Sequence, residues 1–190
     1  PDNSFIDRVL LTRRAIPISL AILWMELAQG LGLSVRGVGF PGHFLLKINS
    51  LQGDVVMDPL DGQSLSREVL AERIDPYRLH DAQSEELDAR LNAYLLGLQP
   101  RDIIARMLRN LKAIYASEAD WLRLIATENR ILTLLPTAWS DYRDRGLAHA
   151  QAGNTRLAVA DLETYLSHVG HAADSPAIAM RVEELRRATN

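Results

Sequence analysis

An apolar helix followed directly by three short strands constrains the fold of this chain more than any other feature. In the predicted helix at residues 17–31, Glu26 is the only charged side chain and apolar residues lie all round, so the helix must be buried. Strands are predicted at residues 35–39, 44–48 and 55–57, with turn residues between them. A buried helix against a small antiparallel sheet predicts an α+β fold for the first part of the chain.

Composition narrows the class of protein. Of the 190 residues, 47% are hydrophobic and 24% are charged, as in ordinary globular proteins. The net charge of −3 does not indicate a positively charged surface that would bind nucleic acid or an anionic membrane. The apolar stretch at residues 16–25 is too short to cross a bilayer, and with no signal-peptide pattern we expect a cytoplasmic protein. Because the sequence opens on Pro1 rather than Met, we expect it to be a fragment.

After a predicted helix at residues 67–74, the second half of the sequence contains only helical patterns. They are predicted at residues 84–96, 101–116, 119–135, 138–152, 155–168 and 177–188. The loop at residues 80–83 is the expected joint between two domains, which gives an α+β domain at residues 1–80 and an all-helical domain at residues 81–190.

The second half also contains an internal repeat. A shift of 34 residues places Leu111 on Arg145, and this period is that of the tetratricopeptide repeat, a helix pair that stacks on its neighbours. The second copy has small residues, Gly146 and Ala158, where such helices cross, whereas the first copy has Lys112 at the small position. Two repeats and a capping helix are expected; the alternative is a helical bundle without repeats.

Two polar residues of the predicted sheet point to hydrolase chemistry. His43 opens the second strand and Asp58 follows the third, so a carboxylate can orient a histidine beside it. In enzymes of this layout a cysteine at a helix start is the nucleophile, because the helix dipole favours the thiolate. The chain contains no cysteine, which excludes a thiol nucleophile, a disulfide framework and a thiolate metal site.

Several motifs carry a resemblance to a known family. They are residues 14–20 (RAIPISL), 37–44 (GVGFPGHF), 58–59 (DP) and 142–146 (YRDRG). In these motifs and their order, most of the chain resembles the bacterial SirB family, in which a transglutaminase-like, papain-related domain precedes tetratricopeptide repeats. The resemblance implies a degenerate transglutaminase-like domain, a cytoplasmic bacterial protein of regulatory role, and a further helical segment ahead of this sequence.

Set against active transglutaminase-like enzymes, Pro17 stands where the cysteine would be, and Ser19 is the only candidate replacement. One hypothesis is therefore a hydrolase or acyltransferase with Ser19 as nucleophile, His43 as base and Asp58 as its orienter. Against it, Pro17 removes one amide from the expected oxyanion hole. The simpler interpretation is that Ser19 caps the helix and that the histidine and aspartate keep two strands in register.

The favoured hypothesis is a non-catalytic interaction module whose repeats bind an unknown protein or peptide. Candidate partner-binding residues, taken from helix-face position, are Arg106, Arg109, Tyr115, Tyr142, Arg143, His149 and Tyr165. A solvated face explains the basic residues more simply, and a scaffold without a groove is a third possibility. No metal or other cofactor is expected, because the five histidines lack metal-ligand spacing. The sequence leaves the oligomeric state open.

Overall fold

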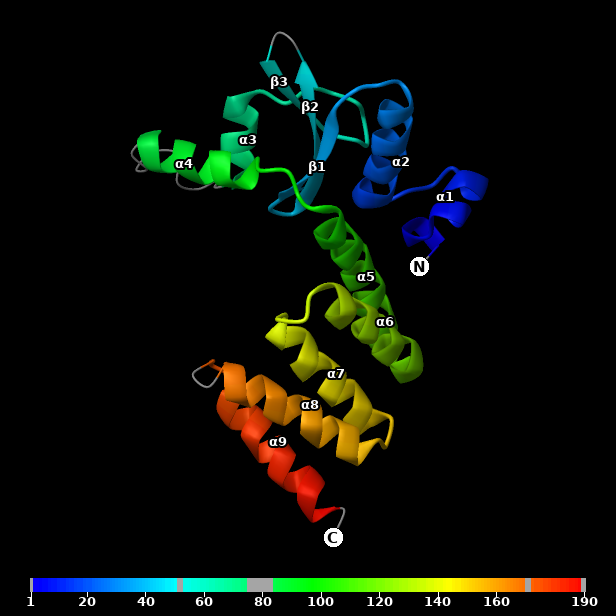
Figure 1. The fold of residues 1–190 in the computed structure, drawn as a ribbon, viewed down its shortest axis with the longest axis vertical. Helices are drawn as coiled ribbons and strands as arrows, with labels where there is room; N and C mark the ends of the chain where they lie inside the picture. Colours follow the sequence, from blue (N-terminus) through cyan, green and yellow to red (C-terminus); the bar gives the residue numbers. More distant parts are fainter. Residues whose placement is uncertain (1, 51–52, 75–83, 170–171, 189–190) are drawn as a thin grey trace. The chain divides into compact units, whose positions relative to one another are not determined.

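The computed structural model describes residues 2–50, 53–74, 84–169 and 172–188, which form two compact units, Pro1–Ile103 and Ile104–Asn190 (Figure 1). The predicted joint at residues 80–83 lies outside the described residues. The first unit contains η1 (Asp2–Ser4), α1 (Ile6–Thr12), α2 (Pro17–Gly30), β1 (Val35–Phe40), β2 (His43–Ser50), β3 (Gly53–Met57), α3 (Arg67–Ile74) and α4 (Ser84–Tyr94).

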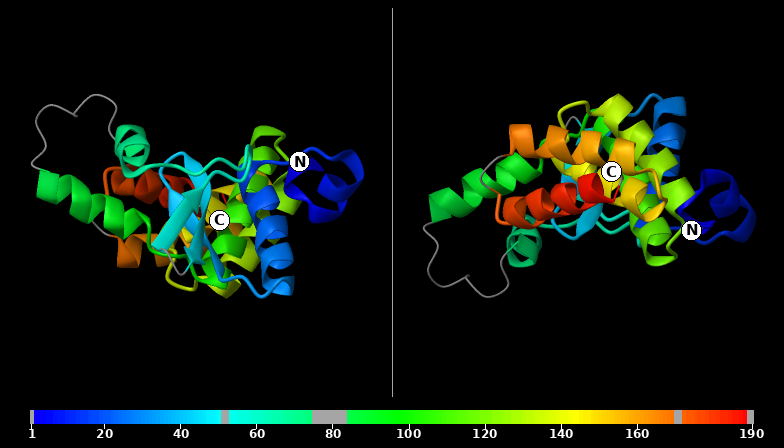
Figure 2. Two further views of the ribbon diagram at one scale, coloured as in Figure 1. Left: turned by 90° about the horizontal axis from the view of Figure 1, so that it is seen from above. Right: turned by 90° about the horizontal axis from the view of Figure 1, so that it is seen from below.

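The core of the first unit is an antiparallel sheet of order β1-β2-β3. Its first hairpin pairs Phe40 with His43 across the dipeptide Pro41-Gly42, where Gly42 has a φ of 68°. Helix α2 packs on one face of the sheet, and α3 and α4 cover the other (Figures 1 and 2). This arrangement confirms the predicted α+β fold.

Residues 84–103 belong to the first unit, although the sequence analysis placed them with the repeats. Leu91 of α4 is fully buried in the same core as Val38 of β1. The segment after α4 then extends the sheet edge, because the amide of Leu98 donates to the carbonyl of Gly37 at 2.8 Å. An amphipathic pattern predicts a helix but does not say which core that helix joins.

The second unit consists of stacked helices. Helix α5 (Pro100–Ser117) leads into it, followed by α6 (Trp121–Leu134), α7 (Trp139–Gln151), α8 (Thr155–His168) and α9 (Ser175–Arg187). Each helix from α6 onward packs on the next one in sequence, as expected of helical repeats. Among the helices of the described residues, none combines the length and the apolar character needed to cross a membrane.

The crossing of α7 and α8 depends on the absence of a side chain at Gly146. A Cβ there would lie 2.9 Å from Leu162 and 3.1 Å from the carbonyl oxygen of Ala158. The repeat of 34 residues places Lys112 and Glu128 at the corresponding positions of α5 and α6. The first crossing therefore replaces a small residue and a leucine by two charged residues.

Gly146→Ala is expected to destabilise the second unit by about 1–3 kcal/mol, because overpacking at this crossing forces the helices apart. The free energy of unfolding, measured by urea denaturation, tests this. In a Leu162→Ala background the same substitution should cost less, since part of the space is then free. Equal costs in the two backgrounds would show that the crossing is not tightly packed.

Candidate functional site

Ser19 lies in the first turn of α2, which begins at Pro17. Its Oγ accepts from the amide of Ile16 at 3.1 Å and lies within donating distance of the carbonyls of Asn3 (2.7 Å) and Ile16 (3.0 Å). The side chain has no exposed surface. Ser19 therefore caps the helix and holds η1 against its start, as the simpler interpretation predicted.

His43 lies on the face of the sheet that α3 and α4 cover. It pairs across the hairpin with Phe40. The ring of Phe40 packs edge-on against the ring of Tyr94 in α4, with the two ring centroids 6.0 Å apart. Cross-strand partners share a face, whereas α2, which carries Ser19, packs on the opposite face. The strand register thus separates the candidate base from the candidate nucleophile.

Asp58 follows β3 and is 8% exposed. Its Oδ1 accepts from the amide of Leu60 at 3.1 Å, and its Oδ2 pairs with Nη1 of Arg73 in α3 at 3.2 Å. These contacts end the strand and attach α3 to the sheet. The sequence analysis missed Arg73, since only the fold brings it to the aspartate.

Three of the seven residues proposed to bind a partner are buried in the helix packing. Tyr115, His149 and Tyr165 are 8%, 8% and 3% exposed. The hydroxyl of Tyr165 donates to Oδ1 of Asp174 at 2.6 Å, and burial lowers the pKa of His149. These three side chains therefore pack between helices. The sequence analysis had instead expected them, from their positions on the helices, to line a groove that binds a partner.

The other four reach solvent at least in part, from α5 and α7. Arg106 is half-buried; Arg109 is 44% exposed and pairs with Asp141 at 2.8 Å. The half-buried Tyr142 stacks on Trp139. Arg143 is 30% exposed and bridges Asp144 at 2.7 Å and Asp174 at 2.6 Å. The accessible basic groups are therefore held in place by carboxylates.

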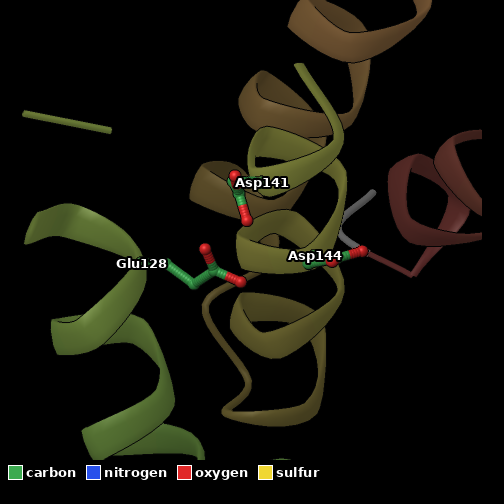
Figure 3. Close-up of side chains that lie close together, drawn as sticks. All are labelled: Glu128, Asp141 and Asp144. Atoms are coloured by element: carbon green, nitrogen blue, oxygen red, sulfur yellow. The ribbon is translucent and has the colours of Figure 1, made fainter. Parts of the chain in front are cut away.

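Between these arginines lies a group of carboxylates that we call the carboxylate cluster: Glu128 of α6 with Asp141 and Asp144 of α7 (Figure 3). Nζ of Lys112 in α5 lies 2.8 Å from Oε1 of Glu128. It also lies 2.7 Å from Oδ1 of Asp141 and 2.6 Å from Oδ2 of Asp144. One ammonium group thus contacts carboxylates from two further helices.

Burial and charge act against each other in this cluster. Burial, together with the nearby charges of Asp141 and Asp144, raises the pKa of Glu128 to about 7, although Lys112 opposes the rise. Burial also works against ionised Asp141, but the hydrogen bonds from Arg109 and Lys112 keep its pKa below the usual value. The pKa of Lys112 is raised by the three carboxylates despite its burial.

One feature of the sequence pointed to this cluster: Lys112 stands at a position where the helices of such repeats need a small residue. Its partners come from two further helices, so sequence spacing alone does not connect them.

Comparison with known proteins defines the class. The sequence model of the transglutaminase-like superfamily matches residues 1–109, and that of the tetratricopeptide repeat matches residues 111–183. A transglutaminase-like domain followed by tetratricopeptide repeats is the order that the motifs predicted, and the resemblance is confirmed. No solved structure matches the chain.

The chain belongs to the UPF0162 family of transglutaminase-like proteins, which includes SirB1. It is 41% identical to a UPF0162 protein of Xylella fastidiosa over 168 residues, which cover 87% of this chain and 58% of the relative. UPF0162 protein PA3419 of Pseudomonas aeruginosa is 31% identical over 194 residues, covering 100% and 67%. SirB1 of Salmonella typhimurium is 27% identical over 170 residues, covering 87% and 60%. The chain thus spans about three fifths to two thirds of these relatives.

Glu128 should make stability depend on pH. The pKa of Glu128 in the folded chain is higher than that of a glutamate in the unfolded chain, so protonation of Glu128 stabilises the fold. This contribution to the free energy of unfolding is fully present below about pH 4.5 and is lost as the pH rises through about 7. The charged groups facing it are Lys112, Asp141, Asp144 and, more distantly, Arg145. Relative to Glu128→Gln, the wild-type chain should lose about 2 kcal/mol of unfolding free energy between pH 5 and pH 8.

Urea denaturation at four pH values between 5 and 8 measures this difference. Glu163→Gln is the control, because Glu163 is a half-exposed surface glutamate of α8, and it should follow the wild-type curve. Parallel curves for Glu128→Gln and the wild type would contradict the shifted pKa.

Proposed function

We propose that the chain is a non-catalytic protein interaction module, in which a transglutaminase-like unit without its nucleophile accompanies tetratricopeptide repeats that bind a partner polypeptide. The order of the two domains supports the interaction role, because tetratricopeptide repeats are stacked helix pairs that offer extended binding surfaces.

The observation that carries the absence of catalysis is the state of Ser19. Pro17, which the resemblance places where the nucleophile would be, has no nucleophilic group, and the hydroxyl group of Ser19 is fully buried. That hydroxyl is engaged by Asn3 and Ile16, whereas His43 lies on the other face of the sheet. A nucleophile must meet both its base and the substrate, so this arrangement favours a scaffold over a serine hydrolase.

The surface proposed to bind the partner lies on α5 and α7, the first helices of the two repeats. Arg109 and Arg143 are its accessible charged groups, and both are oriented by aspartates. Arg106 and Tyr142 extend the same two helices with half-buried side chains. Fixed guanidinium groups beside an aromatic ring suit a polypeptide carrying carboxylate and apolar side chains. The partner is expected to be an extended segment or a helix of another protein.

A fluorophosphonate probe tests the absence of catalysis. Such probes modify activated serines, and Ser19 is buried away from His43, so no adduct is expected at Ser19 by peptide mass spectrometry. Ser19→Ala serves as the control for labelling of other residues. A stoichiometric adduct at Ser19 that disappears in His43→Ala would overturn the proposal in favour of the serine hydrolase.

Peptide display tests the interaction role. Peptides selected against the whole chain should lose at least tenfold in affinity with Arg109→Gln/Arg143→Gln. The matched control is Leu122→Ser/Leu157→Ser, which changes the exposed faces of α6 and α8 and should leave affinity unchanged. The proposed surface is contradicted if the leucine variant loses binding and the arginine variant keeps it, or if repeated selections yield no binder.

A further inference from the structure

Helix α2 has apolar residues on all its sides, yet the structure covers only part of its surface. It packs against β1, β2 and α1 (Figure 1). Its buried residues are Ile18, Ser19, Ala21 and Ala28. The sequence analysis predicted that the whole helix is buried, because a helix that is apolar all round is normally covered on every side. That prediction is wrong for one side of α2, which faces solvent in the described part of the chain.

The open side of α2 is a continuous apolar surface, which we call the α2 face. Its residues are Trp24, Leu27 and Leu31 of the helix and Leu33 of the segment that follows it, and they are 41%, 69%, 78% and 54% exposed. The spacing of three and four residues along the helix puts the first three on one side of it. Single exposed leucines are common on protein surfaces, but a contiguous group of this kind marks a contact site.

The α2 face is also hollowed. A groove of about 500 Å³ is lined by its four apolar residues together with the small residues Ala28 and Gly30. A Cβ at Gly30 would meet no atom of another element within 4 Å, so the groove is open at this point. Glu26 is the only charged side chain among the described residues that line the groove. An apolar groove between two leucines suits the ridge of side chains on another helix.

The relatives of the chain indicate what covers this face. The match covers 58% of the Xylella fastidiosa protein and 67% of PA3419, and in PA3419 it spans 100% of this chain, α2 included. Roughly a third to two fifths of these proteins therefore lies outside the matched region. A helix as long as α2, which has 14 residues, is enough to lie along the groove. The unmatched part of these proteins is long enough to supply such a helix.

A second copy of the chain fits the α2 face less well. A two-fold axis through the face would bring Glu26 of both copies toward the same contact, and like charges beside an apolar contact are destabilising. A groove lined almost entirely by apolar residues is typical of contacts that form within one folded chain or in a permanent complex. Both observations favour a segment of the same polypeptide.

We propose that the α2 face is the docking surface for the part of a UPF0162 protein that this chain does not span, and that an amphipathic helix of that part lays its apolar side in the groove. Apolar residues on that helix at intervals of three and four would pack between Leu27 and Leu31. A lysine or arginine at the edge of the helix would pair with Glu26. The inference concerns the transglutaminase-like unit and does not rest on partner binding by the repeats.

A chimera tests the occupant of the groove. The unmatched part of the Xylella fastidiosa relative, which is 41% identical to this chain over the matched region, is joined to the whole chain in the order of the relative. Because the chain contains no cysteine, a thiol introduced by Leu31→Cys reports the exposure of the α2 face. Its rate of alkylation by iodoacetamide, followed peptide by peptide with mass spectrometry, should fall at least tenfold in the chimera relative to the 190-residue chain.

Two controls locate the contact. Leu157→Cys places a thiol on α8 of the second unit, at a leucine that is 54% exposed, and this thiol should react at the same rate in both chains. Adding Leu27→Glu to the chimera should restore the reactivity of the thiol at position 31, because a carboxylate in the groove repels an apolar helix. Leu157→Glu, the matched charge change on α8, should leave the protection intact.

The full-length Xylella fastidiosa relative gives a second measurement that needs no chimera. Bis-ANS, a dye that fluoresces on apolar surfaces, should be enhanced at least threefold less by this protein than by the 190-residue chain. Equal enhancement by the two proteins would overturn the proposal, as would equal reaction of the thiol at position 31 in the chain and the chimera.

The remaining outcomes separate the other occupants. Protection of the thiol in the 190-residue chain that grows with its concentration would show that a second copy covers the α2 face, and the proposal would fall. Protection in the chimera that survives Leu27→Glu would place the contact outside the groove and overturn the proposal too. Protection confined to the chimera and abolished by Leu27→Glu supports it.

Discussion

The repeat unit depends on the pairing of buried carboxylates with cations from neighbouring helices. Glu128 and Asp141 lie against Lys112 of α5, and Asp161 of α8 pairs with Arg145 of α7 at 2.6 Å. Each pair joins two different helices, and we expect each buried charge to restrict which helix can lie beside it. Leucine and alanine contacts supply the burial, but they fit many relative positions of two helices, whereas a buried charge accepts few.

In the first unit, two of the polar residues that the sequence suggested as catalytic make contacts that hold the fold together. Ser19 caps α2 and Asp58 attaches α3 through Arg73. The hydroxyl of Ser19 bonds to the backbone of Asn3 and Ile16, and the carboxylate of Asp58 bonds to Arg73 and to the amide of Leu60. The motifs of the transglutaminase-like superfamily are thus retained here by residues that also hold the first unit together.

The sequence was enough for most of the fold. The apolar helix and the strands follow from local periodicity, and the structure places them within a few residues of the predicted ranges, as with β1 at Val35–Phe40. The sequence did not predict which of the two units α4 joins, because the apolar face of this helix could pack against the core of either unit. Leu91 joins the sheet only because the chain returns along β1 after α4.

The candidate sites were harder to predict for a related reason. Tyr115 and Tyr165 are buried between helices, and sequence spacing does not separate the part of a helix surface that meets another helix from the part that meets solvent. Which part is covered depends on the neighbouring helix and its crossing angle.

The crossing of α5 and α6 carries this argument further. A small residue, as at Gly146, lets helices approach closely and stabilises them through packing. Lys112 gives up that packing and needs Asp141 and Asp144 from the next repeat to compensate its charge. Two of the carboxylates that compensate Lys112 thus come from α7 of the next repeat, whereas Gly146 and Leu162 of the α7–α8 crossing belong to one repeat. We therefore expect charge at the first crossing to couple the folding of the two repeats, at some cost in the stability of the first repeat alone.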